Sequence, residues 1–172
     1  QASAQVKPFK VKGSGVIIED LFPVAGAAAP HIAIGQATHL GKYTGAGVVQ
    51  IETLDLSDLS GTFFSAVPFV FEAANGDKLS FQYGRTDEES GAAPPAAKAG
   101  EITFVITDHG QLVAVWDAEF NPVPALCTGR FENVVAGSFR MLAVTDPFDF
   151  GPLQAGLAYS WTGEGWIQFK KE

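Results

Sequence analysis

The chain has 172 residues, of which 47% are hydrophobic and 17% are charged. This composition is typical of a folded chain with a sizeable core, so we expect residues 1–172 to form a single domain. The formal net charge of −8 argues against nucleic acid as a partner, because no basic stripe is present to neutralise phosphates. No window approaches 18 consecutive apolar residues, so we expect no membrane span.

The two ends and the cysteine content bear on the environment of the protein. Cys127 is the only cysteine, which excludes an internal disulfide and a zinc site built from cysteines. The sequence begins QASAQVK and resembles a mature chain after removal of a signal peptide, although a truncated chain would begin in the same way. We therefore expect a secreted or periplasmic protein. The cations near the ends are interpreted as belonging to solvated termini: Lys7, Lys10, Lys12, Lys170 and Lys171.

Alternation of apolar and polar residues with period two dominates the chain and predicts antiparallel strands. After an extended segment over residues 1–13, we expect strands at residues 15–19, 31–38, 42–54, 61–73, 78–83, 101–107, 112–120, 138–145 and 157–169. Hairpin turns are predicted at Asn75-Gly76-Asp77 and at Asp108-His109-Gly110. The one predicted helix is a single turn over residues 132–136. About nine strands at this spacing indicate a closed barrel or a sandwich.

Two of these strands show clearly which side chains face the core. The apolar face of the strand over residues 112–120 carries Leu112, Ala114, Trp116, Ala118 and Phe120. The apolar face of the strand over residues 157–169 carries Leu157, Tyr159, Trp161, Ile167 and Phe169. Gly163 and Gly165 interrupt this second face, which favours a bend or a bulge of the kind that closes barrels.

The strand over residues 61–73 is apolar on both faces, which predicts a cover outside as well as inside. One face carries Phe63, Val67, Phe69 and Phe71, and the other carries Phe64, Ala66 and Val70. A loop, a terminal segment or another subunit would supply the outer cover, the last of these in a homodimer or homotrimer. The apolar segment over residues 22–30 would supply it equally well, or would lie over the barrel mouth. Residues 86–100 are acidic and then rich in Ala and Pro, which predicts a long exposed loop.

Three segments resemble one family of proteins. They are TGRFENVVAGSFRMLAV (residues 128–144), FVFEAANGDKLSFQYG (residues 69–84) and GQATHLGKYTGAG (residues 35–47). The first is similar to a corner and outgoing strand of the allene oxide cyclase-like barrels, which are related in fold to dirigent proteins. The other two are similar to segments of secreted bacterial members. The resemblance implies an all-β fold, a single closed antiparallel β-barrel of about eight strands with an apolar central cavity, often trimeric in the plant relatives.

The resemblance does not carry a reaction over to this chain. Plant allene oxide cyclases line their cavity with particular polar residues near an early strand, and that pattern has no match here. Dirigent proteins guide radical coupling with carboxylates in the cavity, and nothing ties Asp20 or Asp117 to that role. Cyclisation of a fatty epoxide is therefore not implied.

Three polar residues are candidate catalytic groups: His39, Tyr43 and Glu132. An imidazole that faces a cavity can act as an acid or a base near neutral pH, and Tyr43 would share its mouth. Burial at a barrel end would raise the pKa of Glu132. Each residue also has a structural interpretation. His39 would be a turn residue before Gly41, Tyr43 a packed ring, and Glu132 an exposed carboxylate.

Aromatic residues at inward positions form the candidate ligand-binding set: Phe69, Phe71, Phe104, Trp116, Tyr159 and Trp161. A barrel of this size holds one small ligand, so we expect a small apolar or amphipathic molecule as partner. No cofactor is expected, because no cofactor fingerprint is present, and an enzyme would be a cofactor-independent isomerase or cyclase. The alternatives are a carrier without catalysis and an interaction or carbohydrate-binding module that uses its outer faces, with Trp166 as an exposed ring.

No metal site is expected. His31, His39 and His109 lack a metal-binding spacing. The acidic pairs in LDLSDLSG and TDPFDFG lack the dense alternation of oxygen donors that a calcium loop needs, which favours turn capping.

Overall fold

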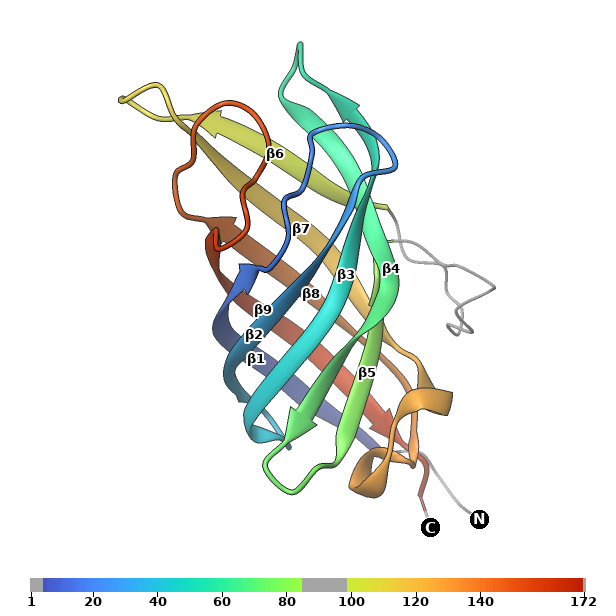
Figure 1. Cartoon of the computed structure of the whole chain (residues 1–172). Helices are drawn as coiled ribbons and strands as arrows, with labels where there is room; N and C mark the ends of the chain where they lie inside the picture. The colour runs from blue at the N-terminus through green and yellow to red at the C-terminus, as the bar shows by residue number, and fades with distance from the viewer. Residues whose placement is uncertain (1–4, 85–98, 172) are drawn as a thin grey trace.

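The computed structural model describes residues 5–84 and 99–171, and it consists almost entirely of antiparallel strands (Figure 1). The strands are β1 (Gln5–Ile17), β2 (Ala28–Ala37), β3 (Gly41–Asp55), β4 (Ser60–Ala73), β5 (Lys78–Tyr83), β6 (Gly100–Ile106), β7 (Leu112–Pro122), β8 (Val134–Thr145) and β9 (Ala158–Phe169). Two short 3-10 turns, η2 (Pro124–Leu126) and η3 (Gly129–Phe131), connect β7 to β8. Across these described ranges there is no helix long and apolar enough to cross a membrane.

The nine strands close into an antiparallel barrel with eight strand positions. β1 lies between β2 and β9, and β3 closes the ring by pairing with β4. β5 and β6 lie end to end in the single position between β4 and β7. β5 pairs with residues 69–72 of β4, and β6 pairs with residues 60–63. β7 likewise pairs with both. The predicted all-β, closed antiparallel barrel of about eight strands is confirmed.

The predicted strands match the observed ones, with two corrections. The segment expected to be extended over residues 1–13 belongs to β1 from Gln5 onward, because β1 pairs with β9 from Gln5 to Val16. The helical turn expected over residues 132–136 is wrong, since η2 and η3 lie earlier and β8 already begins at Val134. Both predicted hairpin turns are present, and Gly76 and Gly110 supply their positive φ angles of 91° and 76°.

The barrel has two ends of different construction (Figure 1). One end carries the start of β1, the end of β9, the turns after β2 and β4, and both 3-10 turns; we call it the terminal end. The β1–β2, β3–β4, β6–β7 and β8–β9 connections lie at the opposite end, the loop end. There Leu21 and Leu153 form an antiparallel bridge and are buried, which joins two connections to each other. Phe22 and Val24, in the segment expected to provide a cover, are exposed.

β4 differs from the strand that its sequence predicts. Phe64, expected on the outside, is only 7% exposed, whereas Val67, expected inside, is 51% exposed. Register shifts between β3 and β4 near Val48 account for this, because an extra residue in one strand reverses the faces of those that follow. Pro68 lies between the parts of β4 that pair with β5 and with β6, so its missing N–H costs no bond to either strand. Most of the predicted 86–100 loop lies outside the described residues, and Gly100 begins β6.

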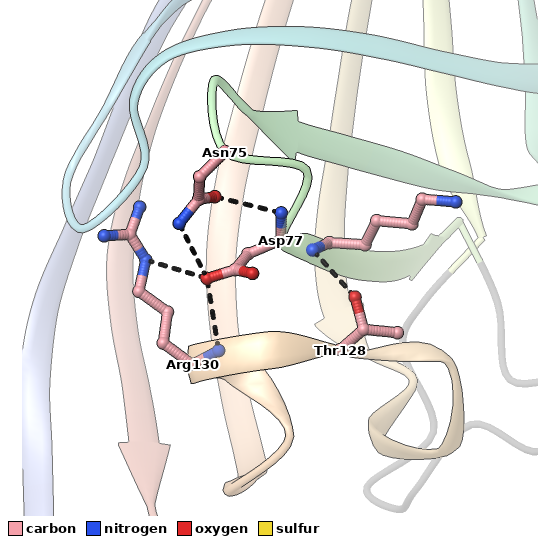
Figure 2. A network of polar contacts seen from close by, with 5 residues as sticks. Asn75, Asp77, Thr128 and Arg130 are labelled. Carbon is pink, nitrogen blue, oxygen red and sulfur yellow. Dashed lines mark hydrogen bonds and ion pairs between the residues drawn. The ribbon is translucent and has the colours of Figure 1, made fainter.

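The corner before β8 is fastened to the turn between β4 and β5 (Figure 2). The Asp77 carboxylate accepts hydrogen bonds from the Asn75 side chain (3.2 Å) and from the Arg130 backbone N–H (3.3 Å). The Arg130 Nε lies 3.8 Å from the same carboxylate. Gly129 has a φ of 62°, and a Cβ there would collide with Asp77. The corner therefore requires glycine at this position for both its backbone and its close contact.

Candidate functional site

The interior toward the terminal end is filled by aromatic rings. The rings of Phe9, Phe71, Phe81, Phe120 and Phe139 are fully buried, and their centroids lie 4.6 to 6.4 Å apart in edge-on and tilted pairs. These are favourable distances and orientations for aromatic side chains. This half of the barrel is a core of packed aromatic rings.

The interior toward the loop end contains a cavity of about 50 Å³. Its lining includes Ile17, Phe63, Trp116, Met141 and Ala143. His31, Tyr83 and Tyr159 also line it, and their polar atoms are turned toward one another. The wall that faces the cavity is therefore apolar.

His31 in β2 is the polar centre of this half. Its Nδ1 lies 2.8 Å from the Tyr159 hydroxyl, and its Nε2 lies 3.0 Å from the Tyr83 hydroxyl. The Tyr159 hydroxyl also donates to the Ile32 carbonyl at 3.5 Å. Phe69 stacks on the imidazole with 5.3 Å between the centroids. A neutral imidazole that donates from Nδ1 and accepts at Nε2 satisfies all of these contacts, and we assign that tautomer on this basis.

Burial keeps the three hydrogen-bonded groups neutral near pH 7. The loss of hydration lowers the pKa of His31 from 6.5 to about 4. The same cause raises the pKa of Tyr83 well above its usual value, with a smaller effect from Tyr159. Burial also raises the pKa of Tyr159. None of the described residues that line the cavity carries a charge, so the site is a neutral hydrogen-bonding centre in an apolar wall.

Tyr43 forms a second buried polar contact beside this centre. Its hydroxyl donates to the Lys12 carbonyl (3.1 Å) and accepts from the Trp161 indole N–H (2.8 Å). Burial raises the pKa of Tyr43 to about 12, against the opposing effect of the Trp161 hydrogen bond. Both hydrogen-bonding roles of the Tyr43 hydroxyl are thus filled within the barrel wall.

Inward-facing glycines provide the space for these rings. A Cβ at Gly15 would collide with the Tyr159 ring, and a Cβ at Gly163 would lie 2.6 Å from the Phe139 ring. The bulge favoured at Gly163 and Gly165 is absent, because β9 pairs there with both β1 and β8 without a register shift. These glycines admit neighbouring rings to the interior.

Half of the predicted ligand-binding set lines the cavity. Those residues are Trp116, Tyr159 and Trp161. Phe69 lies against the face of His31, and Phe71 belongs to the packed half. Phe104 is buried in β6 but does not line the cavity.

The three predicted catalytic residues do not meet at the cavity. His39 lies in the β2–β3 turn at the terminal end and has a φ of 69°. Its ring centroid lies 5.8 Å from that of Phe169, with the two rings nearly perpendicular. Glu132 is exposed directly after η3. Tyr43 is inside the barrel, but its hydroxyl is engaged as described above. Their catalytic roles stay predictions. Trp166, considered for stacking on a sugar, is 39% exposed.

Sequence reasoning missed His31 and Tyr83 as members of the site. β2 turns His31 and Ala33 inward and leaves Ile32 and Ile34 exposed, so the larger apolar side chains are on the outside. The available signal was the run of small residues that alternates with these isoleucines, because small inward residues leave space for rings from other strands.

Neither a search for metal-binding side chains nor comparison with known proteins assigns a function to the chain. Within residues 5–84 and 99–171, no group of three or more His, Cys, Asp or Glu side chains is placed to hold a metal ion. No protein-family model, curated protein or solved structure gives a significant match to the chain. The resemblance to allene oxide cyclase-like barrels therefore stays a prediction, and function has to be argued from the geometry.

Proposed function

We propose that the protein binds a small apolar or amphipathic molecule in the loop-end half of the barrel. The observation that carries this proposal is the apolar cavity beside the hydrogen-bonded His31, Tyr83 and Tyr159. Ligand sites in proteins have this composition: mostly apolar side chains with a few polar groups that fix orientation. A polar group on the ligand would reach a partner here only by displacing the hydrogen bond between His31 and Tyr83.

The cavity volume limits the size of the ligand. A cavity of about 50 Å³ has room for a few water-sized groups, since one water needs roughly 10–15 Å³, and a cavity known to hold benzene measures about 150 Å³. A ligand larger than a few heavy atoms therefore requires the lining to rearrange. Met141 is the lining side chain best suited to move, because its unbranched thioether chain adapts to different shapes.

The electrostatics favour binding over acid–base catalysis. A general base works best when its pKa is near the working pH, and the pKa of His31 is about 4. Tyr83 and Tyr159 are correspondingly weak acids, because burial raises the pKa of each hydroxyl. Cofactor-independent isomerisation or cyclisation is the second hypothesis for this cavity. There the barrel would act by holding a flexible substrate in one shape.

Filling the cavity is expected to weaken ligand binding. Ala143 is buried and lines the cavity, so Ala143→Leu would place its added carbon atoms in the space that the ligand needs. Ligands are first found by a thermal-shift and native-mass screen of fatty acids, terpenoids and phenolics. Calorimetric titration should then show an affinity loss of at least about tenfold, or about 1.4 kcal/mol.

Ala66→Leu is the matched control, because Ala66 is exposed on β4 and receives the same change in volume. It should bind as the wild type does. Equal affinity in the two variants would contradict a ligand site in this cavity. If the protein converts the bound ligand without a cofactor, the result would favour an isomerase or cyclase. If the ligand is recovered unchanged, the result would favour a carrier without catalysis.

The outer face of β1 to β4 suggests a second function, which is self-association. Outward side chains on neighbouring strands form a row in which Val16 lies beside Ile32, Ile32 beside Ala46, and Ala46 beside Val70. Ile34, in the adjacent row, is 63% exposed. We call these five residues the β1–β4 face. Exposed apolar patches of this kind mark interaction sites.

A second copy of the chain is the partner that we propose for the β1–β4 face. Each copy carries a net charge of −8, which opposes association unless the contact is nearly free of charge. At the edge of this face Glu72 and Lys78 lie 3.9 Å apart, so their charges offset each other. Phe64, considered as the outer contact, is buried and unsuited to this role.

A charge on the β1–β4 face should dissociate such an oligomer. Sedimentation equilibrium at micromolar concentration should show a dimer or trimer of the 18.2 kDa chain. Ile34→Lys should shift the oligomer to monomer, because association would bury the lysine charge without a partner. The variant should still fold, because this position is exposed in the monomer. Val105→Lys, at an exposed position on β6, should leave the oligomer intact. A monomeric wild type would refute the proposal.

A further inference from the structure

Pairing of the first and last strands brings together cations from the two ends of the sequence. β1 and β9 run antiparallel, with Lys7 opposite Ile167. The backbone N–H of Lys170 donates to the Asn133 carbonyl at 2.7 Å, which ties the end of β9 to the corner before β8. Lys7, Lys170 and Lys171 therefore lie on one surface at the terminal end of the barrel.

This surface contains a groove of about 460 Å³ with strongly cationic walls. Its lining includes Lys7, Lys170 and Lys171, together with Arg130 and His39. No carboxylate is present among the described residues that line it. In a chain with a net charge of −8, four cations around one groove are a marked local reversal of charge.

Most of the positive charge of the groove is not paired with a carboxylate among the described residues. Lys10, Lys78, Arg130 and Arg140 each have a carboxylate partner within 4 Å. Lys7, Lys170 and Lys171 have no such partner among the described residues. Arg130, which lines the groove, is held by Asp77, so its own charge is partly offset. Figure 2 shows this contact with Asp77. The lysines leave a positive potential that the protein itself does not neutralise.

His39 provides a second, independent indication of a ligand at this place. Its Nε2 is shielded from solvent and has no hydrogen-bond partner in the structure. A shielded polar atom without a partner is costly, and a bound ion is one of the explanations for such an atom. Burial lowers the pKa of His39, a hydrogen bond with the backbone of Pro8 opposes this, and the charges of Lys7 and Arg130 lower the pKa further. Those two charges are therefore close enough to act on the imidazole.

We propose that the groove at the terminal end binds a phosphate group, either as the free ion or as the ester group of a small molecule. A dianion would gain charge-assisted hydrogen bonds from Lys7 and Lys170, and a third from His39 Nε2 once the ring is protonated and has turned toward the anion. The groove is separate from the cavity, since the two share no lining residue. The site is thus independent of the function proposed for the interior.

Inorganic phosphate and phenyl phosphate are the probes, the first for the free ion and the second for an ester. Titrated into the full chain at low ionic strength, at least one should bind saturably with millimolar or tighter affinity. Amide NMR shifts should be confined to residues around His39, Asn133 and Lys170. Saturable binding of neither probe would overturn the proposal.

A double variant tests whether the groove lysines act specifically. Lys7→Gln with Lys170→Gln should weaken binding by at least about tenfold, as loss of two charge-assisted contacts implies. Lys12→Gln with Lys42→Gln removes the same total charge from exposed positions that do not line the groove, and should change affinity much less. Equal weakening by the two double variants would mean general charge attraction and would overturn the assignment.

The titration of His39 gives a readout that lost folding cannot imitate. The groups that face it are Lys7 from β1, Arg130 from η3, and Lys170 and Lys171 after β9. A bound dianion should raise the pKa of His39 by linkage, because it stabilises the imidazolium among these cations. NMR of the imidazole should show this rise with the bound probe but not with sodium chloride at equal ionic strength. An unchanged pKa at saturation would contradict a phosphate beside His39.

Discussion

Acidification from pH 7 to pH 4 should lower the free energy of unfolding by about 3 kcal/mol through His31 alone. The pKa of His31 falls from 6.5 to about 4 on folding, and each pKa unit corresponds to about 1.36 kcal/mol. The unfolded chain binds this proton more readily than the folded chain does. The contribution of His31 to stability is therefore fully present above pH 6.5. It is lost as the pH falls from there to about 4. Protonation would also remove the acceptor at Nε2 that the Tyr83 hydroxyl uses.

Urea unfolding at several pH values, in wild type and His31→Gln, measures this contribution. The variant should be less stable at pH 7, because it loses the paired contacts to Tyr83 and Tyr159. Its further loss between pH 7 and pH 4 should be about 3 kcal/mol smaller than that of the wild type, because carboxylates and His39 titrate in both proteins. His109→Gln, at an exposed turn position, should follow the wild-type curve. Parallel curves for His31→Gln and wild type would show that His31 is not held neutral.

The strands of the barrel were predictable because burial on one face imposes a period of two. Trp116 and Phe120 are buried on the face that alternation predicts for β7, and so is Trp161 in β9. The sharing of one barrel position by β5 and β6 was not predictable, because it depends on which residues of β4 and β7 each strand meets. The bulges that bury Phe64 depend likewise on the register of β3 and β4.

The polar centre was hidden because β2 reverses the usual rule that large apolar side chains face inward. Ile32 and Ile34 point to the outside, and His31 lies inside with small neighbours. The interior is still packed, because rings from other strands, such as Phe69, fill the space above the small residues of β2 and β3. The sequence of β2 alone does not show which rings of other strands pack against it.

The groove at the terminal end was hidden for a similar reason. Lys7 and Lys170 are at opposite ends of the sequence, where charged residues are usually solvated and act alone. Their proximity follows from the β1–β9 pairing that closes the barrel. Strand pairing thus places side by side charges that are far apart in the sequence.

Phe71→Ala is expected to destabilise the barrel by about 3–5 kcal/mol, the usual cost of removing a buried aromatic ring. The Phe71 side chain is fully buried, and its ring centroid lies 4.9 Å from that of Tyr43 and 5.6 Å from that of Phe81. Phe9 of β1 and Phe139 of β8 also lie near this ring, with centroids 6.3 and 6.4 Å away. The neighbouring rings are fixed on separate strands, so they cannot close together over the space that alanine would leave. The loss would be a large share of the roughly 5–15 kcal/mol that stabilises a domain.

Phe22→Ala removes the same group from the β1–β2 connection, where the side chain is 56% exposed. That control should stay within about 0.5 kcal/mol of the wild type, as expected for a surface position. Urea unfolding of both variants at pH 7 provides the comparison. A loss below about 1 kcal/mol for Phe71→Ala would mean that the terminal-end half is not tightly packed. In that case the interior at the terminal end would also offer space for a ligand. The loop-end cavity would then no longer be favoured over it as the binding site.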